Sequence, residues 1–217
     1  MRQRHLAYLF DLDGTLIDTA PDIGAALNHS LETAGLAPVR SDLVRHWVGF
    51  GSRKLIEQAL IHHHKQPAQE QIDALLEPFL SYYTEHIADL SKPYPTTVET
   101  LTALKTEGIP LAVVTNKLQA LAVPVLDALE LSPFFDVIVG GDTASRPKPA
   151  ADPIEYCLQH VAVRPEDALM VGDSITDVDA ARAAGVGIVC LRDGYNHGTD
   201  VATLDPDRVI DRLSELL

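Results

Sequence analysis

Cysteine is scarce in this sequence of 217 residues, and its scarcity bears on the compartment. The two cysteines, Cys157 and Cys190, stand apart, and neither belongs to a Cys-x-x-Cys or mixed Cys/His spacing. The sequence therefore lacks the pattern of a disulfide framework or of a structural zinc site. We expect two buried free thiols in a reducing compartment.

Basic residues are also few. The chain has 17 Lys and Arg against 31 Asp and Glu, which gives a formal net charge of −14. Surfaces that bind nucleic acid or anionic membranes gather Lys and Arg, so neither partner is expected. A small anionic substrate stays compatible with this charge, because a metal ion and a few local cations can reverse the field within a site. The charge does not decide between a monomer and a homodimer.

Long apolar runs are missing as well. The apolar run that follows Arg2 and Arg4 ends at Asp11, which is too short for a signal peptide. No later stretch approaches the roughly 20 apolar residues that a membrane span needs. We therefore expect a cytoplasmic protein without membrane contact. Hydrophobic residues still make up 46% of the chain, enough for a sizeable core.

The chain does contain an alternation of short apolar strands and helices. We expect strands at 6–9, 109–114, 137–139, 168–171 and 187–191, and a closing helix from Pro206 to Leu217. Repeated strand–helix units with short connections predict an α/β fold with a doubly wound parallel sheet, covered by helices on both faces.

Residues 18–90 follow a different pattern, with helical spacing and no strand signal. The last helix expected there runs from Gln69 to Leu90, either unbroken or divided at Pro78. Pro93-Tyr94-Pro95 marks the return to strand–helix alternation. We therefore predict a helical insertion at 18–90 in a catalytic core made of residues 1–17 and 91–217.

Two carboxylates directly follow the first strand, in Asp11-Leu12-Asp13-Gly14-Thr15. A buried carboxylate pair is costly unless a cation or a shared proton compensates it, so the motif favours a site that holds a cation. Taken alone, these residues fit an ordinary polar turn equally well.

Polar residues follow other strands in the same way. Thr115, Asn116 and Lys117 follow the strand that ends at Val114, Asp173 follows another, and Lys148 lies in a loop shortly after a third. The carboxyl ends of parallel strands share one edge of the sheet, so the topology brings these residues together. Carboxylate oxygens suit Mg²⁺, and Thr, Asn and Lys donate to phosphate oxygens. The set predicts phosphoryl transfer.

The same residues carry a family resemblance. Four motifs resemble, in order, those of the haloacid dehalogenase-like hydrolases: Asp11-x-Asp13-Gly14-Thr15, Thr115-Asn116-Lys117, Lys148, and Gly172-Asp173-Ser174-x-x-Asp177. The helical insertion is similar to the small cap of that superfamily. The resemblance implies that Asp11 is the nucleophile and Asp13 the general acid and base, by way of an aspartyl-phosphate. It implies that Thr115 binds phosphate and that Lys148 steadies both the nucleophile and the phosphate.

The resemblance also implies Mg²⁺, held by Asp11, the main-chain carbonyl of Asp13 and Asp173, with Asp177 in support. Dehalogenases and phosphonoacetaldehyde hydrolases of this superfamily lack a carboxylate at the position of Asp13, so its presence favours phosphate esters. Phosphonoacetaldehyde hydrolases use a cap lysine, and Lys54 lies in a comparable part of this chain. We interpret Lys54 as a cation that faces either the substrate or solvent.

Among the phosphatases, the chain resembles the bacterial phosphoglycolate phosphatases, which implies 2-phosphoglycolate as the substrate. The matching segments are Val113-Val114-Thr115-Asn116-Lys117, Gly140-Gly141-Asp142, Lys148-Pro149, Gly194-Tyr195-Asn196-x-Gly198 and, in the cap, Trp47-x-Gly49-x-Gly51. His197 departs from the pattern, because an aromatic residue such as Tyr is expected there.

The candidates for binding the substrate's carboxylate are Lys117 and the turn that contains Gly49, Gly51 and Ser52. For Lys117, a second phosphate contact or a surface charge is equally compatible with the sequence. For the two glycines, a simple flexible turn is the ordinary alternative.

Three other functions fit the same motifs. One is a phosphatase for a sugar or amino-sugar phosphate, such as N-acetylmuramate 6-phosphate, and another is a phosphosugar mutase. The third belongs to a different class, a non-catalytic phospho-aspartate switch or scaffold. The long insertion after Asp11 and the second carboxylate at Asp13 argue against the third.

Overall fold

The computed structural model describes residues 5–217. Arg2 and Arg4, used above to interpret the amino terminus, lie outside the described residues, as do the first four residues of the predicted core. From residue 5 onward, the protein has no helix that is both long and apolar enough to cross a membrane.

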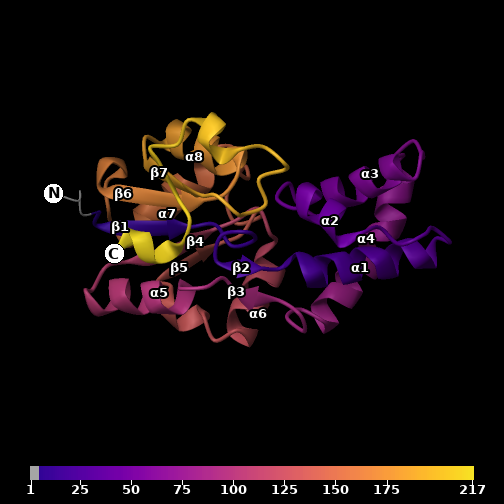
Figure 1. The fold of residues 1–217 in the computed structure, drawn as a ribbon, viewed down its shortest axis with the longest axis horizontal. Helices are drawn as coiled ribbons and strands as arrows, with labels where there is room; N and C mark the ends of the chain where they lie inside the picture. Colours follow the sequence, from indigo (N-terminus) through magenta and orange to yellow (C-terminus); the bar gives the residue numbers. More distant parts are fainter. Residues whose placement is uncertain (1–4) are drawn as a thin grey trace.

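A six-stranded sheet forms the centre of the larger lobe (Figure 1). Its strands are β1 (Ala7–Phe10), β4 (Leu111–Val114), β5 (Val137–Val139), β6 (Ala168–Gly172), β7 (Gly187–Leu191) and β8 (Arg208–Ile210). They lie in the order β5-β4-β1-β6-β7-β8, and every neighbouring pair is parallel. The predicted α/β fold is confirmed. The chain builds β4 and β5 on one side of β1 and then crosses to the other side, so β1 lies at a switch point.

Helices cover both faces of the sheet. One face carries α5 (Thr97–Thr106), α6 (Gln119–Ala128) and the 3₁₀ helix η4 (Leu213–Leu216), and the other carries α7 (Asp152–Val161) and α8 (Ile175–Ala184). The other 3₁₀ turns are η1 (Ser132–Phe134), η2 (Pro165–Asp167) and η3 (Val201–Leu204). Tyr8 and Phe10 of β1 pack on the first face, and Ala7 and Leu9 on the second. Both faces of β1 are apolar because both are covered.

Four helices make up the smaller lobe, beyond the carboxyl ends of the strands (Figure 1). They are α1 (Ala20–Thr33), α2 (Ser41–Trp47), α3 (Ser52–His62) and α4 (Gln69–Glu85). They share an apolar core of their own, which Leu121 and Tyr195 of the larger lobe join. Helix α4 is continuous through Pro78 and ends before Leu90. The domain boundaries at residues 18 and 90 stay a prediction.

A short ribbon connects the two lobes. Strands β2 (Ile17–Asp18) and β3 (Lys92–Pro93) pair antiparallel, so the two connections run side by side. Buried Asp22 of α1 holds the second connection, because its carboxylate accepts hydrogen bonds from the Leu90 and Ser91 amides at 3.0 and 2.7 Å. The sequence did not predict this ribbon, since strands of two residues are too short to show an alternation.

The closing helix predicted from Pro206 to Leu217 is wrong. The structure has β8 there, followed by η4. Buried Ile210, Leu213 and Leu216 repeat every three residues, a spacing that imitates a helix. The strand forms because the free edge of β7 accepts it, with Cys190 opposite Val209.

Candidate active site

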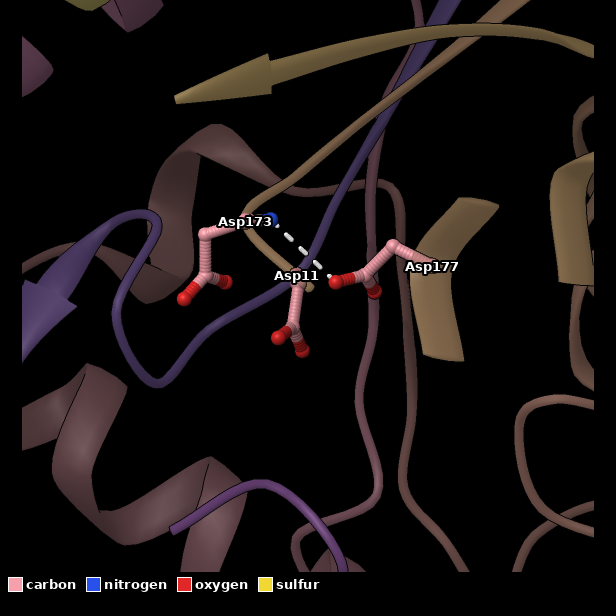
Figure 2. Close-up of side chains that lie close together, drawn as sticks. All are labelled: Asp11, Asp173 and Asp177. Atoms are coloured by element: carbon pink, nitrogen blue, oxygen red, sulfur yellow. Dashed lines mark hydrogen bonds between the residues drawn. The ribbon is translucent and has the colours of Figure 1, made fainter. Parts of the chain in front are cut away.

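Three buried carboxylates converge at the carboxyl edge of the sheet. Asp11 follows β1, Asp173 follows β6, and Asp177 lies in the first turn of α8. One oxygen of each lies within 4.8 Å of the others. In Figure 2 the Asp177 carboxylate points toward Asp11, and Asp11 and Asp173 extend to the same side. Residues from distant segments of the chain thus form one acidic cluster.

The start of α8 fixes Asp177. Its Oδ2 accepts hydrogen bonds from the amides of Asp173 (3.2 Å, dashed in Figure 2) and Ser174 (3.1 Å), in a reciprocal capping box with Ser174. Its Oδ1 accepts a hydrogen bond from Lys148 Nζ at 2.6 Å. Because both of its oxygens already accept hydrogen bonds, Asp177 orients Lys148 and the start of α8.

Lys148 is the counter-charge of the cluster. Its buried Nζ lies 2.9 Å from Asp11 Oδ1 as well as against Asp177. Burial lowers the pKa of Lys148, but the charges of Asp11 and Asp177 raise it further, so the ammonium stays charged. Burial raises the pKa of Asp11 to about 6, although Lys148 opposes the shift. One ammonium faces three carboxylates, so the cluster lacks positive charge.

A divalent cation fits this deficit. Asp173 is aimed by a hydrogen bond from Thr15 Oγ1 to its Oδ1 at 2.8 Å and by another from the Tyr195 amide to its Oδ2. Burial raises the pKa of Asp173 well above its usual range, and the charges of Asp177 and Asp11 add to the shift. Hard, oriented carboxylate oxygens without enough compensating charge suit Mg²⁺-like ions. Asp11 and Asp173 are the residues that would hold one.

Gly194 makes room for Asp173. A Cβ at this position would lie 2.2 Å from Asp173 Cβ, so any side chain would displace the carboxylate. We expect Gly194→Ala to weaken Mg²⁺ binding roughly 10–100-fold, because it disturbs the support of a ligand. Titration of Mg²⁺ followed by calorimetry measures the affinity. Gly24→Ala is the control, since its Cβ would make ordinary contacts with Val44 from 3.5 Å; equal affinities in the two variants would contradict the expectation.

The second carboxylate of the first motif, Asp13, has different neighbours. Its Oδ1 accepts hydrogen bonds from Thr19 Oγ1 at 2.7 Å and from Lys117 Nζ at 3.0 Å, and Lys117 Nζ lies 3.3 Å from Oδ2. Lys117 is buried, with Nζ 4.7 Å from the centre of the Tyr83 ring. The interpretation of Lys117 as a surface charge is therefore wrong.

Thr115 and Asn116 join this site to the smaller lobe. Thr115 is buried at the end of β4, and its Oγ1 accepts a hydrogen bond from the Lys117 amide at 3.2 Å. Asn116 Nδ2 donates to the carbonyl oxygens of Gly49 at 3.1 Å and of Lys148 at 3.0 Å. The Asn116 side chain thus bridges the two lobes beside the carboxylates.

A small cavity of about 40 Å³ lies between the lobes, next to Asp11. Its lining contains most of the predicted site residues, namely Asp11, Asp13, Gly49, Gly51, Ser52, Thr115, Asn116 and Lys117. Lys148, Asp173 and Asp177 do not line the cavity, but they lie close to Asp11, which does. Lys54 is outside it too, half exposed and paired with Glu57 at 2.9 Å, so it faces solvent. Residues of both lobes thus line one space next to Asp11.

His197 holds the lobes together at the rim. Its ring stacks on Phe50 of the α2–α3 turn, with centroids 4.5 Å apart, and Nδ1 lies 2.9 Å from the His46 carbonyl oxygen. A Cβ on Gly49 would lie 3.2 Å from the His197 ring, so only the small residue permits this packing without adjustment. His197 thus combines ring stacking with a polar contact at the position where an aromatic residue is expected.

We expect His197→Ala to loosen this rim. Aromatic pairs contribute about 0.5–1.5 kcal/mol, so amide exchange in residues 46–52 should accelerate about 2–10-fold. Hydrogen–deuterium exchange with mass spectrometry measures the change. His197→Phe retains the stacking but loses the contact with the His46 carbonyl oxygen, so its exchange rate should lie between those of the wild type and His197→Ala. Unchanged exchange in His197→Ala would show that the stacking does not hold the turn.

Sequence reasoning missed three contributors. Thr19 binds Asp13, Tyr83 packs on Lys117, and Tyr195 binds Asp173 through its amide. Tyr195 belongs to the segment Gly194-Tyr195-Asn196-x-Gly198, which resembles the phosphoglycolate phosphatases, so the sequence did contain a signal for it. Tyr83 lies four residues after buried Phe79 on α4, a spacing that indicates only a packed helix face.

Comparisons with known proteins show the family to which the chain belongs. Residues 8–191 match the haloacid dehalogenase-like hydrolase family. Phosphoglycolate phosphatase 1 of Pseudomonas aeruginosa is 41% identical over 211 residues, covering 96% of this chain and 77% of that protein. The phosphoglycolate phosphatase of Agrobacterium fabrum is 43% identical over 210 residues, covering 96% and 89%. A solved structure described as a predicted phosphoglycolate phosphatase from Haemophilus somnus 129PT superposes with a TM-score of 0.92 at 33% identity, covering 100% and 97%.

Proposed function

The chain belongs to the haloacid dehalogenase-like hydrolases, and on that premise we propose that it is a phosphatase that converts 2-phosphoglycolate to glycolate and phosphate. The proposal is supported by relatives named phosphoglycolate phosphatase at about 40% identity over nearly the whole chain. The observation that carries it is one small cavity lined by both Asp11 and Asp13, which gives a nucleophile and a proton donor access to the same phosphate ester.

The residues divide the reaction between them. Asp11 attacks phosphorus to form an aspartyl-phosphate, while Asp13 gives a proton to the departing ester oxygen. Asp13 then takes a proton from the water that releases phosphate from Asp11. Lys148 keeps Asp11 charged and oriented, and Thr115 donates to a phosphate oxygen.

A divalent cation, for which we propose Mg²⁺, supplies positive charge to the phosphate oxygens when bound. Asp11 and Asp173 would hold it together with the Asp13 carbonyl, and Asp177 would support them. The region 18–90 would act as a cap that excludes bulk water, with Asn116 and the turn of Gly49, Gly51 and Ser52 at its contact with the substrate. A cytoplasmic location, the absence of a nucleic-acid partner and a monomeric or homodimeric state stay predictions.

Phosphate release from a small panel tests the proposal. The panel holds 2-phosphoglycolate, a hexose 6-phosphate, N-acetylmuramate 6-phosphate and an aryl phosphate, each with Mg²⁺ or with EDTA. We expect a strong preference for 2-phosphoglycolate, abolished by EDTA. Preference for a sugar phosphate would replace the substrate and keep the chemistry, an isomerised sugar phosphate would indicate a mutase, and no release from any compound would favour a phospho-aspartate switch.

A further inference from the structure

The cavity beside Asp11 has an apolar wall with one basic group in it. Among the residues lining the cavity, all within 5–217, Lys117 alone carries a basic side chain. The same lining contains five apolar side chains, from Ile23, Val48, Leu55, Phe79 and Leu121. A ligand group that reached past the phosphate would therefore meet hydrocarbon and one ammonium. Such a wall suits a small organic anion.

This ammonium has an anionic partner within the protein. Lys117 Nζ lies 3.0 and 3.3 Å from the two Asp13 oxygens, and the Tyr83 ring covers it from α4. Its side chain is 4% exposed and that of Asp13 10%. A buried ammonium without an anion is costly, so Lys117 can leave Asp13 only for another anion.

This pairing conflicts with the proton transfer assigned to Asp13. Asp13 Oδ1 accepts hydrogen bonds from both Thr19 and Lys117, and Lys117 Nζ is also within 3.3 Å of Oδ2. A carboxyl oxygen that protonates an ester oxygen must lie within hydrogen-bond distance of it. In the observed arrangement both Asp13 oxygens contact Lys117 or Thr19, so neither is free to reach an ester oxygen.

We propose that Lys117 exchanges partners when the substrate binds, leaving Asp13 for the carboxylate of the phosphate ester. The inference rests on the proposed function. The incoming carboxylate replaces the Asp13 carboxylate as the anion beside Nζ, so Lys117 keeps a counter-charge throughout. Asp13 retains its hydrogen bond from Thr19, takes up from water the proton that it later gives to the ester oxygen, and turns its other oxygen to the ester. In this scheme Lys117 contacts the substrate's carboxylate and also sets the position of Asp13.

The exchange makes the substrate's carboxylate part of the catalytic switch. A phosphate ester without a carboxylate offers Lys117 no anion beyond the phosphate itself, which is held at Asp11, so Lys117 stays paired with Asp13 in more of the bound complexes. Such an ester should lose kcat as well as affinity. Specificity for small carboxylate-bearing esters would then arise at the proton-transfer step, in addition to binding.

The test compares 2-phosphoglycolate with ethyl phosphate, which lacks the carboxylate. For the wild type and for Lys117→Met, kcat and KM are measured on both esters with Mg²⁺. The quantity compared is kcat/KM for 2-phosphoglycolate divided by kcat/KM for ethyl phosphate. We expect Lys117→Met to lower this ratio at least about 30-fold. Part of the decrease should come from the ratio of the two kcat values. Lys117→Arg should restore part of the ratio, since it returns the charge.

Lys54→Met is the matched control, because it removes a lysine charge from the solvent-exposed side of α3. It should leave the ratio unchanged. Equal losses on both esters in Lys117→Met would overturn the proposal and make Lys117 a permanent support of Asp13. An unchanged ratio would overturn it as well, since the carboxylate would then bind elsewhere.

Two further observations keep the result interpretable. A wild-type enzyme that ignores 2-phosphoglycolate and hydrolyses a sugar phosphate would refute the proposed substrate, a result separate from the behaviour of the Lys117 variants. A crystal structure of the Asp11→Asn protein with 2-phosphoglycolate would show which anion Lys117 contacts. This experiment does not require Lys117→Met to fold. Lys117 Nζ should lie within 3.2 Å of the ligand's carboxylate, and Nζ still on Asp13 would refute the exchange.

Discussion

Replacing Asp11 by Asn should lower kcat for 2-phosphoglycolate roughly 10⁴-fold or more, because the reaction loses its nucleophile. The fold should persist, since the amide has the size of the carboxylate and Lys148 keeps its 2.6 Å hydrogen bond to Asp177. Neutralising one of three clustered acids also removes repulsion. Steady-state kinetics with Mg²⁺ measures the rate, and thermal unfolding in EDTA should give a Tm equal to or above that of the wild type.

The covalent intermediate offers a second readout. Rapid quenching with substrate labelled in its phosphoryl group should leave label on the wild-type chain and none on Asp11→Asn. Asp73→Asn is the matched control, because it alters an exposed ion pair with Arg53 on the cap surface and should leave both readouts unchanged. Turnover by Asp11→Asn within tenfold of wild type would contradict the assignment of the nucleophile.

Lys148→Met should cost both activity and stability. Lys148 is 1% exposed and contacts Asp11 and Asp177 at 2.9 and 2.6 Å, so its loss leaves buried carboxylates unpaired. Breaking a buried pair in this way costs about 3–5 kcal/mol. We expect a loss of that size in the free energy of unfolding at pH 8, measured by urea denaturation in EDTA, and a fall in kcat of roughly 10³-fold.

The stability deficit should shrink as the pH falls from 8 toward 6. Burial already raises the pKa of Asp11 to about 6 while Lys148 opposes the shift, so removing Lys148 raises this pKa further. The folded variant then binds a proton at a higher pH than the unfolded chain does, and acidification favours folding. Lys105→Met, at a surface pair with Asp136, is the control and should cost about 0–1 kcal/mol at either pH. A Lys148→Met deficit that stayed constant between pH 8 and pH 6 would contradict this account.

The sequence predicted the sheet and its acidic edge because each rests on local signals. Apolar runs of four or five residues indicated strands such as β1 and β6. Asp11 and Asp173 come immediately after these two strands in the sequence. Parallel topology then placed those ends together without further information.

The missed features all depend on tertiary contacts. Strand β8 forms on an edge that only the folded sheet provides, and the β2–β3 ribbon needs Ile17 to meet Pro93. The partner of Lys117 could not be predicted either. Its contact with Asp13 depends on how the loops after β1 and β4 approach each other, and no spacing in the sequence encodes that approach.

The position of the helical insertion has a kinetic consequence. Tyr8 of β1 pairs with Leu111 of β4, and Ala7 pairs with Ala168 of β6, so the central strand has no neighbour close to it in sequence. Contacts of this range form slowly, because a long loop must close before they contribute any energy. The insertion shortens that loop once its own helices have packed and its two connections have paired in the ribbon. The order of assembly would then run from the helical lobe to β1 and β4, and last to the β6 side of the sheet.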